Sequence, residues 1–110
     1  MNLFIGGVKM AELVKIADKN DFKEGQGKII QVKGKTIALF LHEGNFYAID
    51  NTCKHMGGPL GEGELEDGNV VCPWHGWKYN IKTGVNALIP SIKVNTYDVK
   101  VDGNDVKIEI

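Results

Sequence analysis

Hydrophobic and polar residues alternate along most of this chain with a period of two, which is typical of half-buried β-strands. Near the C-terminus, residues 105–110 alternate between charged side chains and valine or isoleucine, and residues 97–101 show a similar alternation. The sequence Asp102-Gly103-Asn104, which favours a tight turn, lies between these two segments. The pattern therefore predicts that the chain closes with a β-hairpin.

Four further segments alternate in a similar way, at residues 12–16, 28–33, 36–42 and 45–50. Glycine turns at 33–35 and 43–45 join the last three of these segments, so we expect an antiparallel meander there. No segment shows a sustained period of 3.6 residues; at most, Asp18 caps a single helical turn around Asp21 and Phe22. Many short strands without helices predict an all-β sandwich or a small barrel.

Length and composition indicate one globular domain. The chain has 110 residues, of which 43% are hydrophobic and 25% are charged. Residues 1–9 precede the first clear strand pattern, so we expect a loosely ordered N-terminal extension, followed by a single domain over residues 10–110. No run approaches the roughly 20 apolar residues of a membrane helix, and residues 1–9 do not resemble a signal peptide. We therefore expect a cytoplasmic protein that makes no contact with a membrane.

The charge of the chain argues against nucleic acid as a partner. The 13 basic residues are all lysine, and 14 acidic residues bring the net charge to -1. A chain of this charge lacks the positive field that holds a polyanion. It also lacks arginine, whose planar side chain is suited to bidentate binding of phosphate or carboxylate.

Between residues 51 and 90 the alternation gives way to glycine, proline and aromatic residues, with short apolar strands expected at 69–72 and 77–81. Loops of this kind often carry functional sites. The region holds both cysteines and two of the three histidines, in the segments Cys53-Lys54-His55 and Cys72-Pro73-Trp74-His75. Two cysteines are too few for a disulfide scaffold. The matched pairs indicate metal ligands rather than two buried thiols and two unrelated histidines.

Two kinds of metal site use two cysteines and two histidines. A structural zinc ion takes this set in tetrahedral geometry, but its usual order is a cysteine pair followed by a histidine pair. A 2Fe-2S cluster takes the set when two histidines replace two thiolates on one iron. In this chain the order alternates, as Cys53, His55, Cys72 and His75. The residues therefore leave both a zinc ion and a 2Fe-2S cluster open.

The two loops resemble the ligand loops of the Rieske family. The motifs that carry the resemblance are Cys53-x-His55-Met56-Gly57-Gly58-Pro59-Leu60 and Cys72-Pro73-Trp74-His75-Gly76-Trp77. The flanking strand pattern extends the resemblance over nearly the whole chain from Glu12 onward. It implies an antiparallel Rieske-type β-sandwich with two cluster-binding loops at one end. It also implies one Rieske-type 2Fe-2S cluster whose ligands are Cys53, His55, Cys72 and His75.

We expect seven further residues to surround the cluster without binding it: Gly57, Gly58, Trp74, Gly76, Trp77, Tyr79 and Pro90. Gly57 and Gly58 favour tight turns that bring backbone amides near the sulfides. The two tryptophans either shield the cluster or pack at the edge of the core. By the resemblance, Tyr79 donates a hydrogen bond to a ligand sulfur, and Pro90 belongs to a third loop that covers the cluster.

Charge and hydrogen bonding predict the reduction potential of such a centre. Two ferric ions, two sulfides, two thiolates and two neutral imidazoles have charges that sum to zero, so this cluster accepts an electron more readily than a four-thiolate cluster does. High-potential members of the family carry a disulfide and a serine at the places where this chain has Gly58, Trp74 and Trp77. Without those groups, we predict a potential of about -150 to +50 mV, in the lower half of the family range.

The resemblance implies a small one-electron carrier rather than an enzyme. The partners that it implies are a flavin reductase upstream and a terminal oxygenase or another redox protein downstream, and we expect the carrier to be a monomer. Two alternatives stay open, a fixed small subunit of a nitrite-reductase-type complex and a zinc-stabilised binding module. The acidic run Glu62, Glu64, Glu66 and Asp67 is either a solvated face or a surface that steers a partner.

Overall fold

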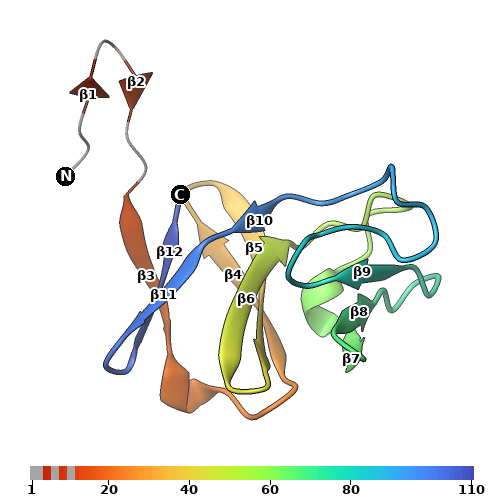
Figure 1. Ribbon diagram of the computed structural model, residues 1–110, viewed down its shortest axis with the longest axis horizontal. Helices are drawn as coiled ribbons and strands as arrows, with labels where there is room; N and C mark the ends of the chain where they lie inside the picture. Colours follow the sequence, from red (N-terminus) through yellow and green to blue (C-terminus); the bar gives the residue numbers. More distant parts are fainter. Residues whose placement is uncertain (1–3, 6–7, 10–11) are drawn as a thin grey trace.

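The computed structural model describes residues 4–5, 8–9 and 12–110. This part of the chain is built of antiparallel strands with two short 3-10 helices, η1 (Lys19–Asp21) and η2 (Leu60–Glu62) (Figure 1). Neither helix is long enough to cross a membrane, and the described residues contain no other helix that does so. Of the predicted extension over residues 1–9, the positions 1–3 and 6–7 lie outside the described residues. The remainder forms the strand pair β1 (Phe4–Ile5) and β2 (Val8–Lys9).

The predicted meander forms the centre of a four-stranded sheet with the order β10-β6-β5-β4. Its strands are β4 (Gly27–Val32), β5 (Lys35–His42), β6 (Asn45–Asp50) and β10 (Thr96–Tyr97). Both tight turns lie where the glycines predict them. In the first turn, Lys33 and Gly34 have φ angles of 49° and 75°, and Glu43 and Gly44 have 51° and 79° in the second. Positive φ at both central residues matches the twist of paired strands.

The predicted C-terminal hairpin is confirmed over β11 and β12, which belong to a three-stranded sheet with the order β11-β12-β3. Its strands are β3 (Leu13–Asp18), β11 (Val99–Asp102) and β12 (Asp105–Glu109). Asp102 pairs with Asp105 across the turn. Tyr97, expected in the first strand of this hairpin, instead lies in β10 and pairs with Ala48 of β6. The predicted helical turn is η1, but the expectation that Asp18 caps it is wrong. The Asp18 carboxylate makes no capping hydrogen bond and instead lies 3.0 Å from Lys15 Nζ.

A third sheet carries one of the ligand loops. Its strands have the order β7-β8-β9 and are β7 (Glu64–Glu66), β8 (Asn69–Val71) and β9 (Lys78–Asn80). Strands β8 and β9 are the short apolar strands expected in this region. Strand β7 was not expected from the sequence, because it contains a single apolar residue, Leu65, between two glutamates. Leu65 pairs with Val70 of β8.

Strand β5 lies at the centre of the molecule and is buried on both faces. Ile37 and Leu39 point into a core cluster that includes the β12 residues Val106 and Ile108. On the opposite face, Ala38 and Phe40 belong to a second cluster, described below with the ligand loops. The expectation of a half-buried strand over 36–42 is therefore wrong in this respect. The four-stranded sheet is covered on both sides, and the predicted all-β sandwich is confirmed.

Candidate metal centre

The first ligand loop, residues 51–59, leaves β6 and ends at η2. It closes around Cys53, whose backbone N–H donates to the carbonyl of Gly58 at 3.0 Å. The carbonyl of Cys53 accepts from the N–H of Gly57 at 2.9 Å. Gly57 has a φ of 78°, a left-handed conformation that glycine adopts without strain. The loop therefore turns back on itself directly after its cysteine and its histidine.

The second ligand loop, residues 72–77, joins β8 to β9 and repeats this backbone pattern. The N–H of Cys72 donates to the carbonyl of Trp77 at 2.7 Å, and the N–H of Gly76 donates to the carbonyl of Cys72 at 3.0 Å. Gly76 has a φ of 76°, close to that of Gly57. The two loops hold their cysteines in equivalent positions, although the histidine follows two residues after Cys53 and three residues after Cys72.

The four predicted ligands come together as two like pairs. The thiols of Cys53 and Cys72 are in contact and are buried, with 2% and 3% of each residue exposed. The imidazoles of His55 and His75 are exposed, with ring centroids 4.9 Å apart. Trp77 stacks on His55 at 4.4 Å. The structure thus presents a sulfur pair on the inside and a nitrogen pair on the outside.

Burial raises the pKa of the Cys72 thiol, and the adjacent Cys53 thiol acts in the same direction. The backbone amides of Trp74 and His75 lower this pKa, because they donate hydrogen bonds toward the sulfur. A buried thiolate surrounded by amide donors is suited to a positively charged metal, which supplies the charge that water does not.

Tyr79 lies below the first loop on β9 and is fully buried. Its hydroxyl oxygen lies 3.4 Å from Cys53 Sγ and accepts the backbone N–H of Lys54 at 3.0 Å. Burial, followed by the neighbouring Cys53, raises the pKa of Tyr79 to about 12. The hydroxyl therefore keeps its proton at neutral pH and is available as a donor beside the sulfur.

Gly58 of the first loop lies directly against the second loop. A Cβ at this position would lie 2.6 Å from Cys72 Sγ and 3.2 Å from the indole of Trp74. Trp74 is 57% exposed, whereas Trp77 packs against the core cluster that contains both cysteines. The two tryptophans thus differ: Trp77 belongs to the edge of the core, and Trp74 covers the outside of the loops. Pro90 is exposed in the segment between β9 and β10, and its role stays a prediction.

The grouping of the donors tests which metal they suit. Among the described residues, no three side chains of histidine, cysteine, aspartate or glutamate converge as they would around one ion. A structural zinc site needs four such ligands around a single ion. A 2Fe-2S cluster with two histidine ligands needs only two protein ligands at each iron. A thiol pair beside an imidazole pair therefore fits the cluster better than it fits zinc.

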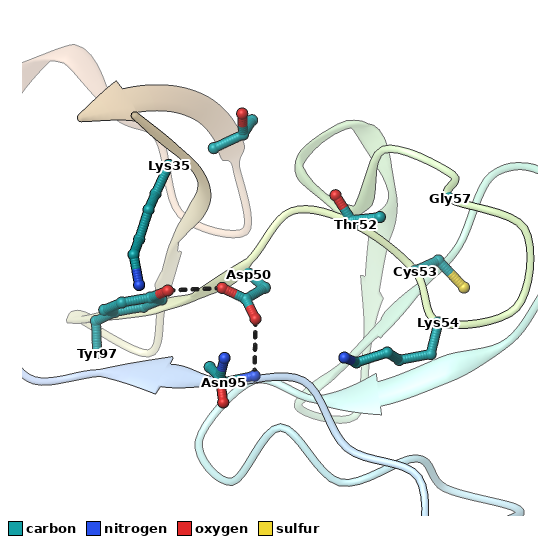
Figure 2. A pocket seen from close by; sticks show the side chains of 9 residues that line it. Lys35, Asp50, Thr52, Cys53, Lys54, Gly57, Asn95 and Tyr97 are labelled. Carbon is teal, nitrogen blue, oxygen red and sulfur yellow. Dashed lines mark hydrogen bonds between the residues drawn. The ribbon is translucent and has the colours of Figure 1, made fainter. Parts of the chain in front are cut away.

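A cavity of about 500 Å³ lies beside the first loop, between Cys53 and β10 (Figure 2). Asp50, the last residue of β6, is one of the residues that line it. One carboxylate oxygen accepts the Tyr97 hydroxyl at 2.7 Å and the other accepts the backbone N–H of Asn95 at 3.0 Å. Because both oxygens are occupied, Asp50 acts as a tie between β6 and the chain around β10. It anchors the loop that begins one residue later.

Sequence reasoning missed two buried asparagines near the loops, Asn51 and Asn86. The side-chain oxygen of Asn51 accepts the N–H of Gly61 at 2.7 Å and holds the end of the first loop. Asn86 is 2% exposed, is the bridge partner of Tyr79 and lowers the pKa of its hydroxyl. Asparagine before a turn is a known signal for a side chain that binds backbone amides two or three residues later, and that signal could have identified Asn86.

Comparison with known proteins shows one family. The Rieske [2Fe-2S] domain matches residues 12–98. The ferredoxin component of the naphthalene 1,2-dioxygenase/salicylate 5-hydroxylase systems of a Ralstonia species is 35% identical over 92 residues, covering 83% of this chain and 88% of the relative. A solved complex of reduced oxygenase and oxidized ferredoxin in carbazole 1,9a-dioxygenase contains a similar chain, with a TM-score of 0.81 and 26% identity. The match covers 88% of this chain and 92% of that one.

A nitrite reductase small subunit of Mycobacterium tuberculosis has a TM-score of 0.85 but only 18% identity, and covers 92% of this chain and 96% of its own. That likeness shows the fold alone. The family is shown by the domain match over most of the chain and by the identity to the ferredoxin component. Both findings agree with the sequence motifs of the two ligand loops. The chain belongs to the Rieske [2Fe-2S] domain family, and its cofactor is a Rieske-type 2Fe-2S cluster.

Proposed function

We propose that this protein is a one-electron carrier whose cluster is bound by the thiolates of Cys53 and Cys72 and the imidazoles of His55 and His75. It takes electrons from a flavin reductase and passes them to a terminal oxygenase or another redox partner. The observation that carries the proposal is the arrangement of the donors, a buried thiol pair behind an exposed imidazole pair. We propose further that the carrier acts as a monomer in the cytoplasm.

The bound cluster supplies one-electron chemistry, and the protein controls access to it. On the inner side, the core excludes water from the sulfurs of Cys53 and Cys72. On the outer side, His55 and His75 reach the surface, where a partner can approach closely. Exposed apolar side chains, Met56 at 59%, Trp74 at 57% and Leu88 at 85%, offer contact area without a strong ion pair. Such a surface suits a partner that binds briefly and leaves.

The relatives support an oxygenase as one partner. One is a ferredoxin component of dioxygenase and hydroxylase systems, and a similar chain occurs in a complex of ferredoxin with an oxygenase. An oxygenase needs electrons delivered one at a time, which a single cluster of this kind provides. For this chain, the direction of transfer and the flavin reductase upstream belong to the proposal.

Analysis of the purified protein tests the cluster and its role together. We expect two irons and two acid-labile sulfides per chain, a red-brown colour, and a single reversible one-electron reduction at about -150 to +50 mV. A colourless protein that holds one zinc ion would support the zinc-stabilised module instead. A midpoint of +200 mV or above would overturn the argument from the missing disulfide and serine.

Exchange of one ligand tests the assignment of the histidines. His55→Cys replaces a neutral ligand with a thiolate, so any cluster retained should have a more negative potential, because its net charge falls by one. The matched control is His42→Cys, at the end of β5 and outside both ligand loops, which should leave the potential unchanged. A potential that rises in His55→Cys contradicts the assignment.

The alternative of a fixed nitrite-reductase-type subunit predicts different behaviour in solution. A free carrier elutes as a 12.1 kDa monomer and exchanges between a reductase and an oxygenase that are mixed with it. A fixed subunit copurifies with its large subunit from native extract at a constant ratio. Transfer of electrons between two separate proteins at substoichiometric amounts of this chain supports the carrier, and failure of that transfer supports the subunit.

A further inference from the structure

Asn86 is the more buried of the two buried asparagines, at 2% exposure, and its orientation is set by the loop that follows it. Its Oδ1 accepts the backbone N–H groups of Leu88 and Ile89, both at 2.9 Å. The carbonyl end of the amide is therefore occupied. The other end, an NH₂ group that only donates, is directed to β9, where Asn86 and Tyr79 are bridge partners.

Among the described neighbours of the Tyr79 hydroxyl, one can accept its proton. The oxygen accepts the N–H of Lys54 at 3.0 Å, and the side-chain amide of its bridge partner Asn86 lies beside it. Both neighbours present donors to the hydroxyl oxygen, which has two lone pairs. The remaining neighbour is Cys53 Sγ, at 3.4 Å. The hydroxyl proton therefore points to the sulfur.

We propose that Asn86 is a positioning residue that directs the Tyr79 hydroxyl proton onto Cys53 Sγ and so raises the reduction potential of the centre. The inference rests on the proposed function, because Cys53 must be a ligand of the cluster. Hydrogen bonds to ligand sulfurs stabilise the reduced state, which carries more negative charge. Asn86 thus links the exposed loop with Leu88 and Ile89 to the electronic properties of the cluster, through a single side chain.

Reduction potentials of three variants test this link. Tyr79→Phe removes the hydroxyl and should lower the midpoint potential. Asn86→Leu keeps the branching at Cγ but removes the amide and frees the hydroxyl to turn away, so it should shift the potential in the same direction by a smaller amount. The double variant should have the potential of Tyr79→Phe alone, because Asn86 acts only through the hydroxyl. An Asn86→Leu shift that persists in the Tyr79→Phe background, or no shift at all, overturns the inference.

Asn80 provides a matched control for the loss of a loop cap. Its Oδ1 accepts the N–H groups of Lys82 and Thr83 at 2.8 and 3.0 Å, which is the same type of turn as that at Asn86. Asn80→Leu should therefore leave the potential at the wild-type value. A fall equal to that of Asn86→Leu would show that disturbance of a loop is sufficient, and would overturn the specific role of Asn86.

A second variant keeps the test valid if Asn86→Leu does not fold. Asn86→Asp retains an oxygen for the amides of Leu88 and Ile89 but presents an acceptor to Tyr79, which competes with Cys53 for the hydroxyl proton. Its potential should fall at least as far as that of Tyr79→Phe, and an unchanged potential overturns the inference. Absence of iron from the wild-type protein would instead reject the proposed function, so the two failures are distinguishable.

Discussion

At the scale of single residues, the ligand loops use glycine for two different physical reasons. Gly76 has a φ of 76°, and a Cβ there would meet no heavy atom within 4 Å. Gly58 does not have a positive φ, but a Cβ there would lie 2.6 Å from Cys72 Sγ. Gly76 is therefore needed for backbone conformation, whereas Gly58 is needed for the close approach of one loop to the sulfur of the other.

These two reasons predict different effects of the same substitution. Gly58→Ala should lower the iron content of the purified protein severely, because the methyl group displaces Cys72 from its position. Gly76→Ala should keep two irons per chain and lose about 1–2 kcal/mol of stability, the cost of a left-handed alanine. Iron analysis and thermal unfolding of both variants check this. Equal iron content in the two proteins would contradict the distinction.

At the scale of elements, β5 contributes side chains to both core clusters of the molecule. Leu39 points into the core cluster shared with β12, and its neighbour Phe40 points into the cluster that contains Cys53 and Cys72. Gly27, opposite Phe40 on β4, leaves room for the phenyl ring, because a Cβ there would lie 2.5 Å from it. The strand thus separates one core cluster from the other, which contains the two cysteines of the ligand loops.

This separation predicts that stability and potential respond independently. Leu39→Ala should cost about 2–5 kcal/mol in the free energy of unfolding, which is typical of a buried leucine, and should leave the potential unchanged. Val101→Ala is the control, since Val101 is 47% exposed and should cost less than about 1 kcal/mol. Denaturant unfolding and a redox titration measure both quantities. A changed potential in Leu39→Ala would show that the two clusters are coupled.

The tie between β6 and β10 predicts how stability depends on alkaline pH. Burial raises the pKa of Tyr97 above its usual value of 10.0, and the hydrogen-bonded Asp50 adds to this. Above pH 10 the unfolded chain loses the phenolic proton while the folded chain keeps it, so the free energy of unfolding should fall as pH rises. Tyr97→Phe should show a shallower fall between pH 10 and 11, although it is less stable at pH 7. Parallel profiles for the two proteins would contradict this.

At the scale of the whole molecule, charge is distributed unequally around the ligand loops. Lys35 and Lys54 line the cavity beside Cys53. On the other side, Glu62, Glu64 and Glu66 line a cavity of about 460 Å³ beside Cys72. Of these, Glu66 pairs with Lys78 at 3.1 Å. A net charge of only -1 therefore conceals a mixed lining of two lysines and Asp50 beside Cys53 and an acidic side beside Cys72.

The acidic side predicts a salt-dependent rate. Replacing Glu62, Glu64, Glu66 and Asp67 by their amides should lower the second-order rate of electron transfer to a partner with a basic surface at low ionic strength. At high salt the variant and the wild type should converge, because screening removes long-range attraction. The control carries the same replacement at four exposed acidic residues outside these loops: Asp21, Asp98, Asp102 and Glu109. Equal rates at low salt would identify the acidic run as a solvated face.

The sequence by itself determined most of the strands, the tight turns and the motifs of the two loops. The C-terminal hairpin of β11 and β12, the glycine turns at 33–35 and 43–45, and the motifs around Cys53 and Cys72 are all readable from short segments. Each depends on local chemistry, either the two-residue period of a strand or the positive φ of a turn. Two loops with matched cysteines and histidines were therefore sufficient to indicate the family.

Only the tertiary structure decided which faces are buried and which distant side chains meet. Burial of β5 on both faces, the inward thiols with outward imidazoles, and the contacts of Tyr79 with Lys54 and Asn86 all join residues far apart in the chain. No local period encodes such contacts, because they depend on how three sheets pack together. The sequence therefore determined the family and the kind of cofactor, and the packing decided the hydrogen bonds and the exposure around the two loops.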